Sequence, residues 1–288
     1  TKIRDVYGKK CDYDVIGESW ELSAHPDGQS RIAEGRYKGM LFNEYLNIIG
    51  KDALGWKCQA QVQIHPDDEY ALENENEYGK NEMWYVVDSE PGAYLYCGLS
   101  RDASKEEILE RINNNTITDI LNKIEVKAGD VVMVKAGTIH AIGAGVFICE
   151  IQQNSNCTYR MYDYDRRDKF GNPRELHVKK ALDVVDNHKY IKDNKTEVVI
   201  ARNEHFTEER LVQCKYFEVY KYDVNDEAKI TVDEASFVSV LFINGSGTIE
   251  TDDYEKTMEF KAGDSFFVSA GLRSIIVKGQ ATMVVTRV

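Results

Sequence analysis

Short apolar runs separated by turn-forming residues dominate the hydrophobic pattern of the chain. The runs are rich in Val, Ile, Tyr and Phe, which favour strands, and turns containing glycine follow many of them. Few helical patterns lie between the runs. The pattern therefore indicates a mainly β protein, built as a closed sandwich or barrel of the jelly-roll kind. The clearest predicted strands cover residues 57–64, 83–87, 93–99, 131–134, 139–142, 146–152, 238–243, 248–251, 265–268 and 282–287.

Helical patterns occur in only a few stretches. Residues 41–49 have helical spacing and are followed by Gly50, a typical stop signal. Ser104-Lys105-Glu106-Glu107 has the form of a capping box, which predicts a helix beginning there, and a second short helix is expected at 117–124. We therefore expect a helical insert over about residues 101–123, inside an otherwise β-rich part of the chain.

An internal repeat indicates two related domains. Lys127-Ala128-Gly129-Asp130 is followed at fixed spacing by a valine and an Ala-Gly pair, and the same pattern returns at Lys261-Ala262-Gly263-Asp264. Repeats of this kind are typical of duplicated structural units. The expected organisation is an N-terminal catalytic domain at 1–185, a linker at 186–212 and a degenerate C-terminal β-domain at 213–288.

Composition narrows the classes of function. Of the 288 residues, 42% are hydrophobic and 30% are charged, which is typical of a globular protein. The formal net charge of −13 disfavours nucleic acid as a partner. No apolar run reaches the roughly 20 residues needed to cross a bilayer. Six scattered cysteines and the lack of a signal-peptide pattern predict free thiols and a cytoplasmic location. The expected partner is a small molecule, and the sequence leaves the oligomeric state open.

Four residues are candidates for one metal site. Gln63 and His65 are two positions apart, so on a strand their side chains leave the same face. Glu82 begins a predicted strand, and His140 follows a glycine turn of the repeat. Two imidazoles, a carboxylate and an amide oxygen suit zinc or a similar divalent ion. In the repeat register His140 aligns with Ser274, so only the first domain is expected to bind metal.

Three further residues are candidates for catalysis or substrate binding. Glu150 lies in an apolar run, where an unpaired carboxylate is costly, so it is either a proton-transfer group or part of a structural ion pair. Arg160 ends a strand-like run and can hold an anion or polarise a substrate oxygen. Lys80 is two residues before Glu82 and can reach the same pocket. The charged residues at 163–167 are expected to be solvated.

At these residues the chain resembles the type I mannose-6-phosphate isomerases, in the short two-domain form found in bacteria. The matching stretches follow the family order through most of the first two-thirds of the chain, whereas the C-terminal domain matches only in general style. The stretches are Glu18–Gly28, Gln63–Asp68, Gly79–Tyr85, Ala136–Ala141 and Glu150–Arg160.

The resemblance implies a fold, a reaction and a set of roles. It implies cupin-type jelly-roll domains and one zinc ion per chain, bound by Gln63, His65, Glu82 and His140. The implied reaction interconverts mannose 6-phosphate and fructose 6-phosphate by proton transfer between C1 and C2. Arg160 occupies the catalytic arginine position of the family, while Lys80 and Glu150 match pocket residues of its longer members. Gln61 departs from the family, which usually has a small hydroxyl residue at that position.

Two other functions remain open on the sequence. A cupin oxygenase or decarboxylase that uses iron or manganese usually has a His-x-His pair, and here Gln63 takes the first position of that pair. This replacement favours a Lewis acid over a redox metal. A non-catalytic sugar-binding cupin would not need Arg160 or all four ligand positions, and the sequence retains each of them.

Overall fold

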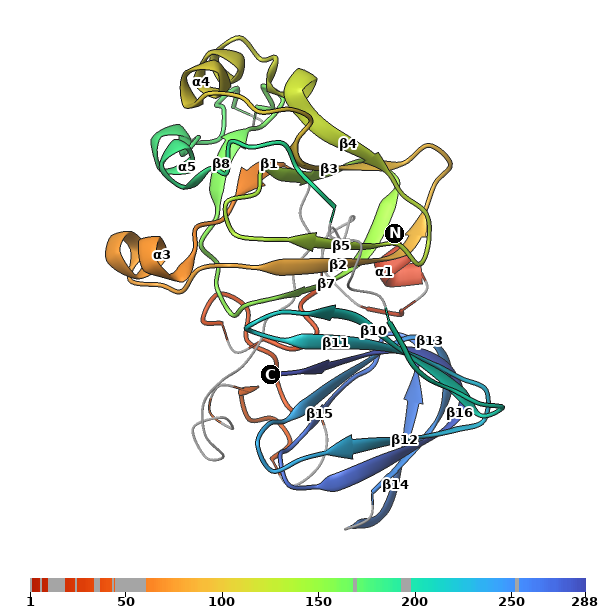
Figure 1. Ribbon diagram of the computed structural model, residues 1–288. Helices are drawn as coiled ribbons and strands as arrows, with labels where there is room; N and C mark the ends of the chain where they lie inside the picture. Colours follow the sequence, from red (N-terminus) through yellow and green to blue (C-terminus); the bar gives the residue numbers. More distant parts are fainter. Residues whose placement is uncertain are drawn as a thin grey trace. The chain divides into compact units, whose positions relative to one another are not determined.

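The computed structural model forms two compact units (Figure 1). The first unit is Ser23–Lys192, and the second combines Thr1–Leu22 with Asp193–Val288. Most of the expected helix at 41–49 lies outside the described residues. The structure describes residues 2–5, 7–9, 19–23, 25–33, 37–42, 44, 61–167, 170–192, 198–251 and 254–288.

Two antiparallel sheets build the first unit. A cluster of buried residues joins them: Trp84 and Val86 of one sheet pack with Leu95 and Cys97 of the other. The interior between the sheets is therefore apolar, as expected for two sheets packed face to face. The larger sheet has the order β4 (Leu121–Glu125), β3 (Tyr94–Leu99), β6 (His140–Ile142), β1 (Val62–Ile64) and β8 (Tyr159–Tyr162), and the smaller has β5 (Val131–Val134), β2 (Glu82–Ser89) and β7 (Val146–Gln152).

Helices pack on the outer face of the larger sheet. The buried side chains of α4 (Lys105–Asn113) and α5 (Val178–Val184) share a cluster with Val62 and Ile64 of β1. Helix α4 begins where the sequence predicts, because the Ser104 hydroxyl accepts a hydrogen bond from Glu107 N at 3.2 Å. Another helix, α3 (Asp68–Glu75), follows β1 along the chain.

The second predicted helix, at 117–124, is wrong over its second half. Only Ile117–Ile120 is helical, as the single 3₁₀ turn η1, and β4 begins at Leu121. Strand β4 pairs with β3, and this pairing satisfies the backbone groups that a longer helix would have satisfied internally. The tertiary partner thus decides between helix and strand in this short apolar run.

The second unit is built around two long strands, β13 (Val238–Thr251) and β16 (Arg273–Arg287), which pair along most of their length. A β-bulge between Phe242 and Asn244 interrupts that pairing. A short helix, α1 (Lys2–Asp5), belongs to the same unit. The strands are β9 (Val198–Arg202), β10 (Phe206–Gln213), β11 (Glu218–Val224), β12 (Glu227–Val232), β13 (Val238–Thr251), β14 (Tyr254–Lys261), β15 (Ser265–Val268) and β16 (Arg273–Arg287).

The expected linker at 186–212 is wrong for its described C-terminal part. Strand β9 and most of β10 lie within it, and they pair with each other in the sheet of the second unit. Strand β9 ends the path of the sheet, and most of its side chains are exposed. An exposed edge strand tolerates polar residues, so its composition resembles that of a loop.

The predicted repeat forms the same turn in both units. In the first unit, the Lys127 N–H donates to the Asp130 carboxylate at 2.8 Å. In the second, the Lys261 N–H donates to the Asp264 carboxylate at 2.9 Å. Each lysine also forms an ion pair with the aspartate of its own turn. The repeat is therefore confirmed as a structural one, and its aspartates serve the turn.

The turn glycines allow a matched test of stability. Gly129 and Gly263 have φ values of 93° and 83°, which L residues rarely adopt. We expect Gly129→Ala to lower the free energy of unfolding by about 1–3 kcal/mol, from backbone strain alone, because nothing lies within 4 Å of the new Cβ. Gly263→Ala is expected to cost more, because its Cβ would lie 2.7 Å from the Cβ of Tyr7. Urea unfolding of both variants checks the order, and equal losses would contradict it.

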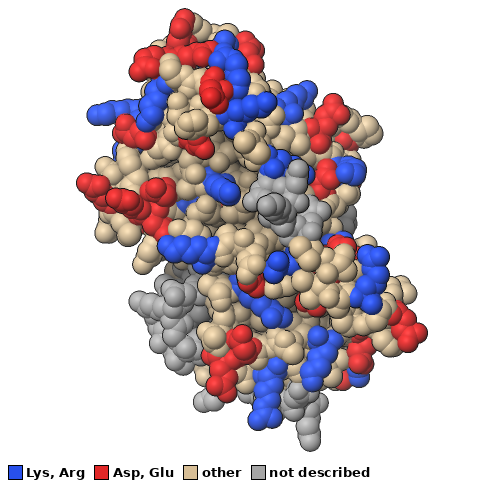
Figure 2. Space-filling model, in the orientation of Figure 1, with Lys and Arg blue, Asp and Glu red and all other residues tan. Residues whose placement is uncertain are grey.

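Charge is mixed on the surface shown in Figure 2. Lys and Arg side chains are scattered among acidic ones on this face, so the net charge of −13 does not make the face uniformly negative. Among the described residues, no helix is both long enough and apolar enough to cross a membrane.

Candidate metal centre and active site

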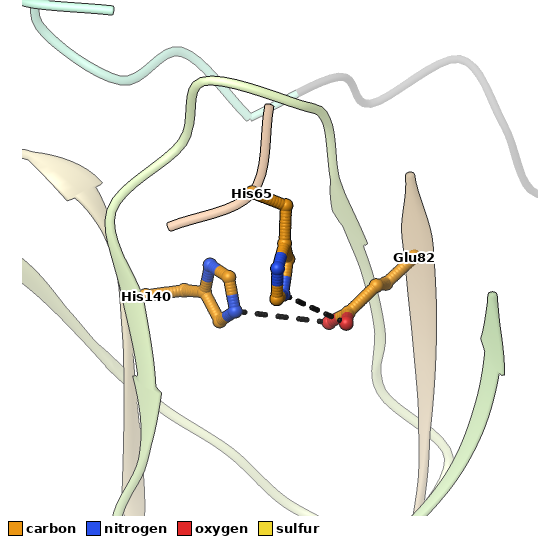
Figure 3. Close-up of side chains that lie close together, drawn as sticks. All are labelled: His65, Glu82 and His140. Carbon is orange, nitrogen blue, oxygen red and sulfur yellow. Dashed lines mark ion pairs between the residues drawn. The ribbon is translucent and has the colours of Figure 1, made fainter. Parts of the chain in front are cut away.

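Three strands bring the predicted metal ligands together. Gln63 lies on β1 and pairs in register with His140, the first residue of β6. His65 follows directly after β1, and Glu82 is the first residue of β2, in the other sheet of the first unit. The side chains of His65, Glu82 and His140 point toward one another (Figure 3). The register of β1 and β6 thus places ligands that are far apart in the sequence at one point.

The cluster is tight and buried. One possible ligand atom from each of His65, Glu82 and His140 lies within 4.8 Å of the other two. His65 Nε2 is 3.0 Å from Glu82 Oε1, and His140 Nε2 is 3.7 Å from Glu82 Oε2. All three side chains are at most 1% exposed. Among the described residues, this is the one group of His, Cys, Asp and Glu side chains arranged to hold a metal ion.

Backbone carbonyls orient both imidazoles. His65 Nδ1 lies 2.8 Å from Cys157 O, and His140 Nδ1 lies 2.8 Å from Thr138 O. A carbonyl only accepts, so each Nδ1 carries the proton and donates it. The Nε2 lone pairs of both rings are then directed into the cluster. Metal-binding histidines typically use such an outer hydrogen bond to fix tautomer and orientation.

Burial and neighbouring charges shift the pKa values of the three side chains, His65, Glu82 and His140. Burial lowers the pKa of His140 to about 3, and burial together with the charge of Lys80 lowers the pKa of His65. Burial alone would raise the pKa of Glu82, but Lys80 and His65 hold it well below its usual range. At neutral pH the site therefore contains two neutral imidazoles and one carboxylate, which are the protonation states of metal ligands.

Lys80 is the counter-charge of this site. Its Nζ lies 2.8 Å from Glu82 Oε1, and the residue is 1% exposed. The structure therefore brings Lys80 into the cluster, beside the candidate ligand. A buried lysine is costly unless it is paired, and the ion pair with Glu82 offsets that cost.

The residues present fit a divalent metal ion. Neither carboxylate oxygen of Glu82 accepts a hydrogen bond of regular geometry from the described residues. Two imidazole lone pairs and a carboxylate that converge in a buried space repel one another unless a cation or proton lies between them. Nitrogen and oxygen donors of this kind suit zinc.

Gln61 and Gln63 connect the cluster to Arg160. Arg160 Nε donates to Gln61 Oε1 at 2.6 Å, and Gln61 Nε2 donates to Gln63 Oε1 at 3.0 Å. Gln63 Nε2 in turn lies 3.0 Å from His140 Nε2. A half-turn of the Gln63 carboxamide would direct its oxygen toward the imidazoles and its Nε2 toward Gln61, so Gln61 Oε1 would then be the acceptor shared by Gln63 and Arg160. Sequence reasoning missed this role of Gln61, although Gln61 lies two positions before Gln63, the spacing that places strand side chains on one face.

Glu150 is linked to the cluster through Trp84. Glu150 Oε2 accepts a hydrogen bond from Trp84 Nε1 at 3.1 Å, and Glu150 is only 6% exposed. The Trp84 ring contacts His140 edge-on, with a centroid separation of 5.4 Å. The carboxylate is thus buried and held by a neutral donor, which is a suitable environment for a group that takes up and releases a proton.

Arginines surround the outer side of Arg160. Its Nη1 donates to Glu175 O at 2.7 Å, and burial followed by the charge of Arg174 lowers the pKa of Arg160. Arg174 and Arg166 both bond to Asp163, which is buried. The expectation that the charged run at 163–167 is solvated is therefore wrong for Asp163. Two guanidinium groups, those of Arg166 and Arg174, share the Asp163 carboxylate, while Arg160 bonds to uncharged acceptors, which leaves positive charge available for an anion.

Comparison with known proteins gives the same family along the whole chain. The family model described as "Mannose-6-phosphate isomerase, cupin domain" matches residues 207–288. The putative mannose-6-phosphate isomerase YvyI of Bacillus subtilis is 38% identical, over 100% of this chain and 94% of the relative. The mannose-6-phosphate isomerase of Streptococcus mutans is 37% identical, over 86% of this chain and 81% of the relative.

Solved structures of isomerases also match this chain. The crystal structure of the mannose 6-phosphate isomerase from Bacillus subtilis matches with a TM-score of 0.90 at 35% identity, over 100% of this chain and 94% of that one. A phosphomannose isomerase structure from Salmonella typhimurium, at 15% identity and a TM-score of 0.72, shares the fold.

The fold is mainly β with a cupin-type domain. The relatives are named mannose-6-phosphate isomerases, which form a class of aldose–ketose isomerases. Within this class, the chain belongs to the mannose-6-phosphate isomerase family. The family model matches the second unit, so the expectation that the C-terminal domain matches only in general style is wrong.

The glutamine link to Arg160 can be tested directly. We expect Gln61→Leu to lower kcat/KM for mannose 6-phosphate by about 10- to 100-fold, because both Arg160 and Gln63 lose the partner that orients them. Gln280→Leu, at an exposed position of the second unit, is the matched control and should keep the wild-type value. Steady-state kinetics on both variants decide the point, and an unchanged Gln61→Leu enzyme would show that the link has no role.

Proposed function

We propose that this chain interconverts mannose 6-phosphate and fructose 6-phosphate at the buried cluster. One zinc ion is held by Gln63, His65, Glu82 and His140. The observation that carries the proposal is the His65–Glu82–His140 cluster, in a chain whose relatives are named mannose-6-phosphate isomerases. When bound, zinc supplies Lewis-acid chemistry, which stabilises negative charge on the oxygens at C1 and C2.

The residues of the chain supply the proton transfer. In aldose–ketose isomerisation a base removes the proton from the carbon next to the carbonyl and returns it to the neighbouring carbon. Glu150 is the base that this proposal favours, because it is buried and accepts a hydrogen bond from the neutral Trp84 N–H. Arg160 stabilises the developing oxyanion. Lys80, whose Nζ lies 2.8 Å from Glu82 Oε1, contacts the sugar oxygens next to that carboxylate.

Several structural details belong to the same proposal. Each unit is a cupin-type jelly roll, and the segment around α4 and η1 is a helical insert in the first. Only the first unit binds metal. The enzyme acts in the cytoplasm, a location supported by Cys97, Cys157 and Cys214 being free thiols.

Two other functions compete with isomerisation. An oxygenase or decarboxylase using iron or manganese would carry a histidine at the Gln63 position, and the amide there disfavours redox chemistry. A non-catalytic sugar-binding protein would not need the oriented link from Arg160 through Gln61 to the cluster. Both observations favour the isomerase.

A coupled assay tests the proposal. Purified enzyme is given mannose 6-phosphate, and the fructose 6-phosphate formed is converted to glucose 6-phosphate and measured through a dehydrogenase, with oxygen uptake followed in parallel. We expect turnover without oxygen uptake. Removal of metal with a chelator should abolish turnover, and one equivalent of zinc should restore it. Binding of the sugar phosphate without turnover by the zinc-loaded protein would support the binding protein instead.

A further inference from the structure

The second unit contains the counterparts of the metal-site strands. The Gly129 N–H donates to Val86 O at 2.8 Å, and the Gly263 N–H donates to Phe242 O at 2.7 Å. The repeated turn therefore contacts β2 in the first unit and β13 in the second in the same way. Val86 and Phe242 therefore hold corresponding positions. The first residue of β2 is Glu82, four positions before Val86, and the first residue of β13 is Val238, four positions before Phe242.

Strand pairing supports this correspondence. Glu82 pairs with Val134, and Val238 pairs with Val268, the matching valines of the repeat. An apolar Val238 therefore occupies the backbone position that corresponds to Glu82. A metal ion would have no carboxylate ligand there.

The other ligand positions have also changed. Gln63 pairs with His140 in the first unit, and Thr231 pairs with Ser274 in the second. Thr231 and Ser274 thus stand at the backbone positions of a glutamine and a histidine.

The remaining ligand position contains an aspartate. The Gly137 N–H donates to His65 O at 2.8 Å, and the Gly271 N–H donates to Asp233 O at 2.7 Å. Asp233 therefore corresponds to His65. A threonine, an aspartate, a valine and a serine in place of the four ligands do not make a zinc site.

A cavity of about 330 Å³ lies at these positions in the second unit. Its volume is within the range of small-molecule sites, roughly 300–1,000 Å³. All of its lining residues belong to the second unit. We call it the C-terminal cavity, and the lining residues used below are Cys214, Lys215, Thr231, Asp233, Val238 and Arg287.

The C-terminal cavity has gained a cation where the first unit has an amide. Gln152 pairs with Glu82, and Arg287 pairs with Val238, so Arg287 corresponds to Gln152. Arg287 Nε is buried and has no hydrogen-bond partner among the described residues. Native proteins seldom leave such a donor unsatisfied. Lys215 adds a second positive charge; its Nζ lies 5.1 Å from the centroid of the Tyr216 ring, and it forms no ion pair with a described carboxylate.

The carboxylates of the C-terminal cavity are already engaged. Glu218 accepts hydrogen bonds from Tyr220 Oη, at 2.7 Å, and from the Gln213 amide. Asp233 Oδ1 accepts from the backbone N–H groups of Ala235 and Ser236, at 2.9 and 3.0 Å. Arg287 and Lys215 lie over the rings of Tyr220 and Tyr216 and form no ion pair with a described carboxylate. Thr231 and Ser236 line the same space, and the Ser236 hydroxyl, which donates to Phe237 O, can still accept a hydrogen bond. This combination suits a ligand with both an anionic group and hydroxyl groups.

We propose that the second unit binds a phosphorylated polyol, such as a sugar phosphate, in the C-terminal cavity without metal. Arg287 and Lys215 contact the phosphate, and Thr231 and Ser236 contact hydroxyl groups. The duplication would thus have kept a binding function after losing the ligands for metal. This proposal does not depend on the reaction at the first unit.

The rate at which Cys214 is alkylated can report whether a ligand occupies the C-terminal cavity. It lines the C-terminal cavity and is half-buried, whereas Cys97, Cys149 and Cys157 are buried. Sorbitol 6-phosphate, which has no carbonyl group and cannot be isomerised, is the probe. The intact protein is alkylated with iodoacetamide at increasing probe concentrations, and peptide mass spectrometry follows each cysteine separately. We expect Cys214 alkylation to slow at least fivefold at saturation, with sorbitol alone giving no protection. An unchanged rate up to 10 mM probe, on the order of the weakest useful affinities, would overturn the proposal.

Variants separate this cavity from the metal site. Arg287→Gln restores the residue type that the first unit has at the corresponding position, and it should weaken protection at least tenfold. Lys215→Gln tests the contribution of the second positive charge, which lies at an exposed position. Arg202→Gln, at an exposed arginine of β9, is the control and should protect like the wild type. Protection should persist in His140→Ala. Its loss in that variant, or its retention in Arg287→Gln, would overturn the proposal, and neither result depends on turnover.

Discussion

His140→Ala is expected to abolish both isomerisation and metal binding, lowering kcat/KM by about 10³-fold or more. His140 supplies one of the two imidazole nitrogens of the cluster, and its Nδ1 is already committed to Thr138 O. Alanine removes that ligand and leaves the Glu82 carboxylate and the remaining imidazole without a complete metal site. Steady-state kinetics and the metal content of the purified variant measure the two effects together.

Ser274→Ala is the matched control for this experiment. Ser274 occupies the position in the second unit that corresponds to His140, and it is buried as His140 is. Its replacement should leave the metal content and kcat/KM at wild-type values. A His140→Ala enzyme that retains full activity and one equivalent of metal would show that the cluster is not the site of the reaction.

Glu150→Gln is expected to lower kcat by about 10²- to 10⁴-fold while metal content stays at the wild-type level. The amide has nearly the same shape as the carboxylate, and its oxygen can still accept the hydrogen bond from Trp84 Nε1. Only the capacity to take up a proton is lost. Because Glu150 is not proposed as a metal ligand, the effect should be seen in kcat.

Exchange of the substrate C2 hydrogen with solvent deuterium separates this role from a structural one. In the variant, exchange should slow in parallel with kcat, while the midpoint of thermal unfolding changes little. Exchange at the wild-type rate would assign the base to another group and leave Glu150 as a structural partner of Trp84.

The sequence predicts the local parts of the site well. Gln63 and His65 share a strand face because side chains alternate along a strand, and this rule needs only their spacing. The repeated Lys-Ala-Gly-Asp turn likewise depends on residues within four positions, and both copies form as expected. What the sequence encodes over a few residues can therefore be read directly.

Contacts between distant residues could not be predicted in the same way. The carbonyl that orients His65 belongs to Cys157, 92 positions away, and Gln61 meets Arg160 across 99 positions. Strand β9 has too many exposed side chains to stand out from a loop. Such features depend on sheet register, which a single sequence fixes only weakly.

Anomalous X-ray diffraction on crystals of the active enzyme, recorded on both sides of the zinc absorption edge, tests the central claim most directly. The expected result is one zinc peak per chain among Gln63, His65, Glu82 and His140, and no zinc peak in the C-terminal cavity. Crystals of protein that turns over mannose 6-phosphate but shows no metal peak at this cluster would contradict the account.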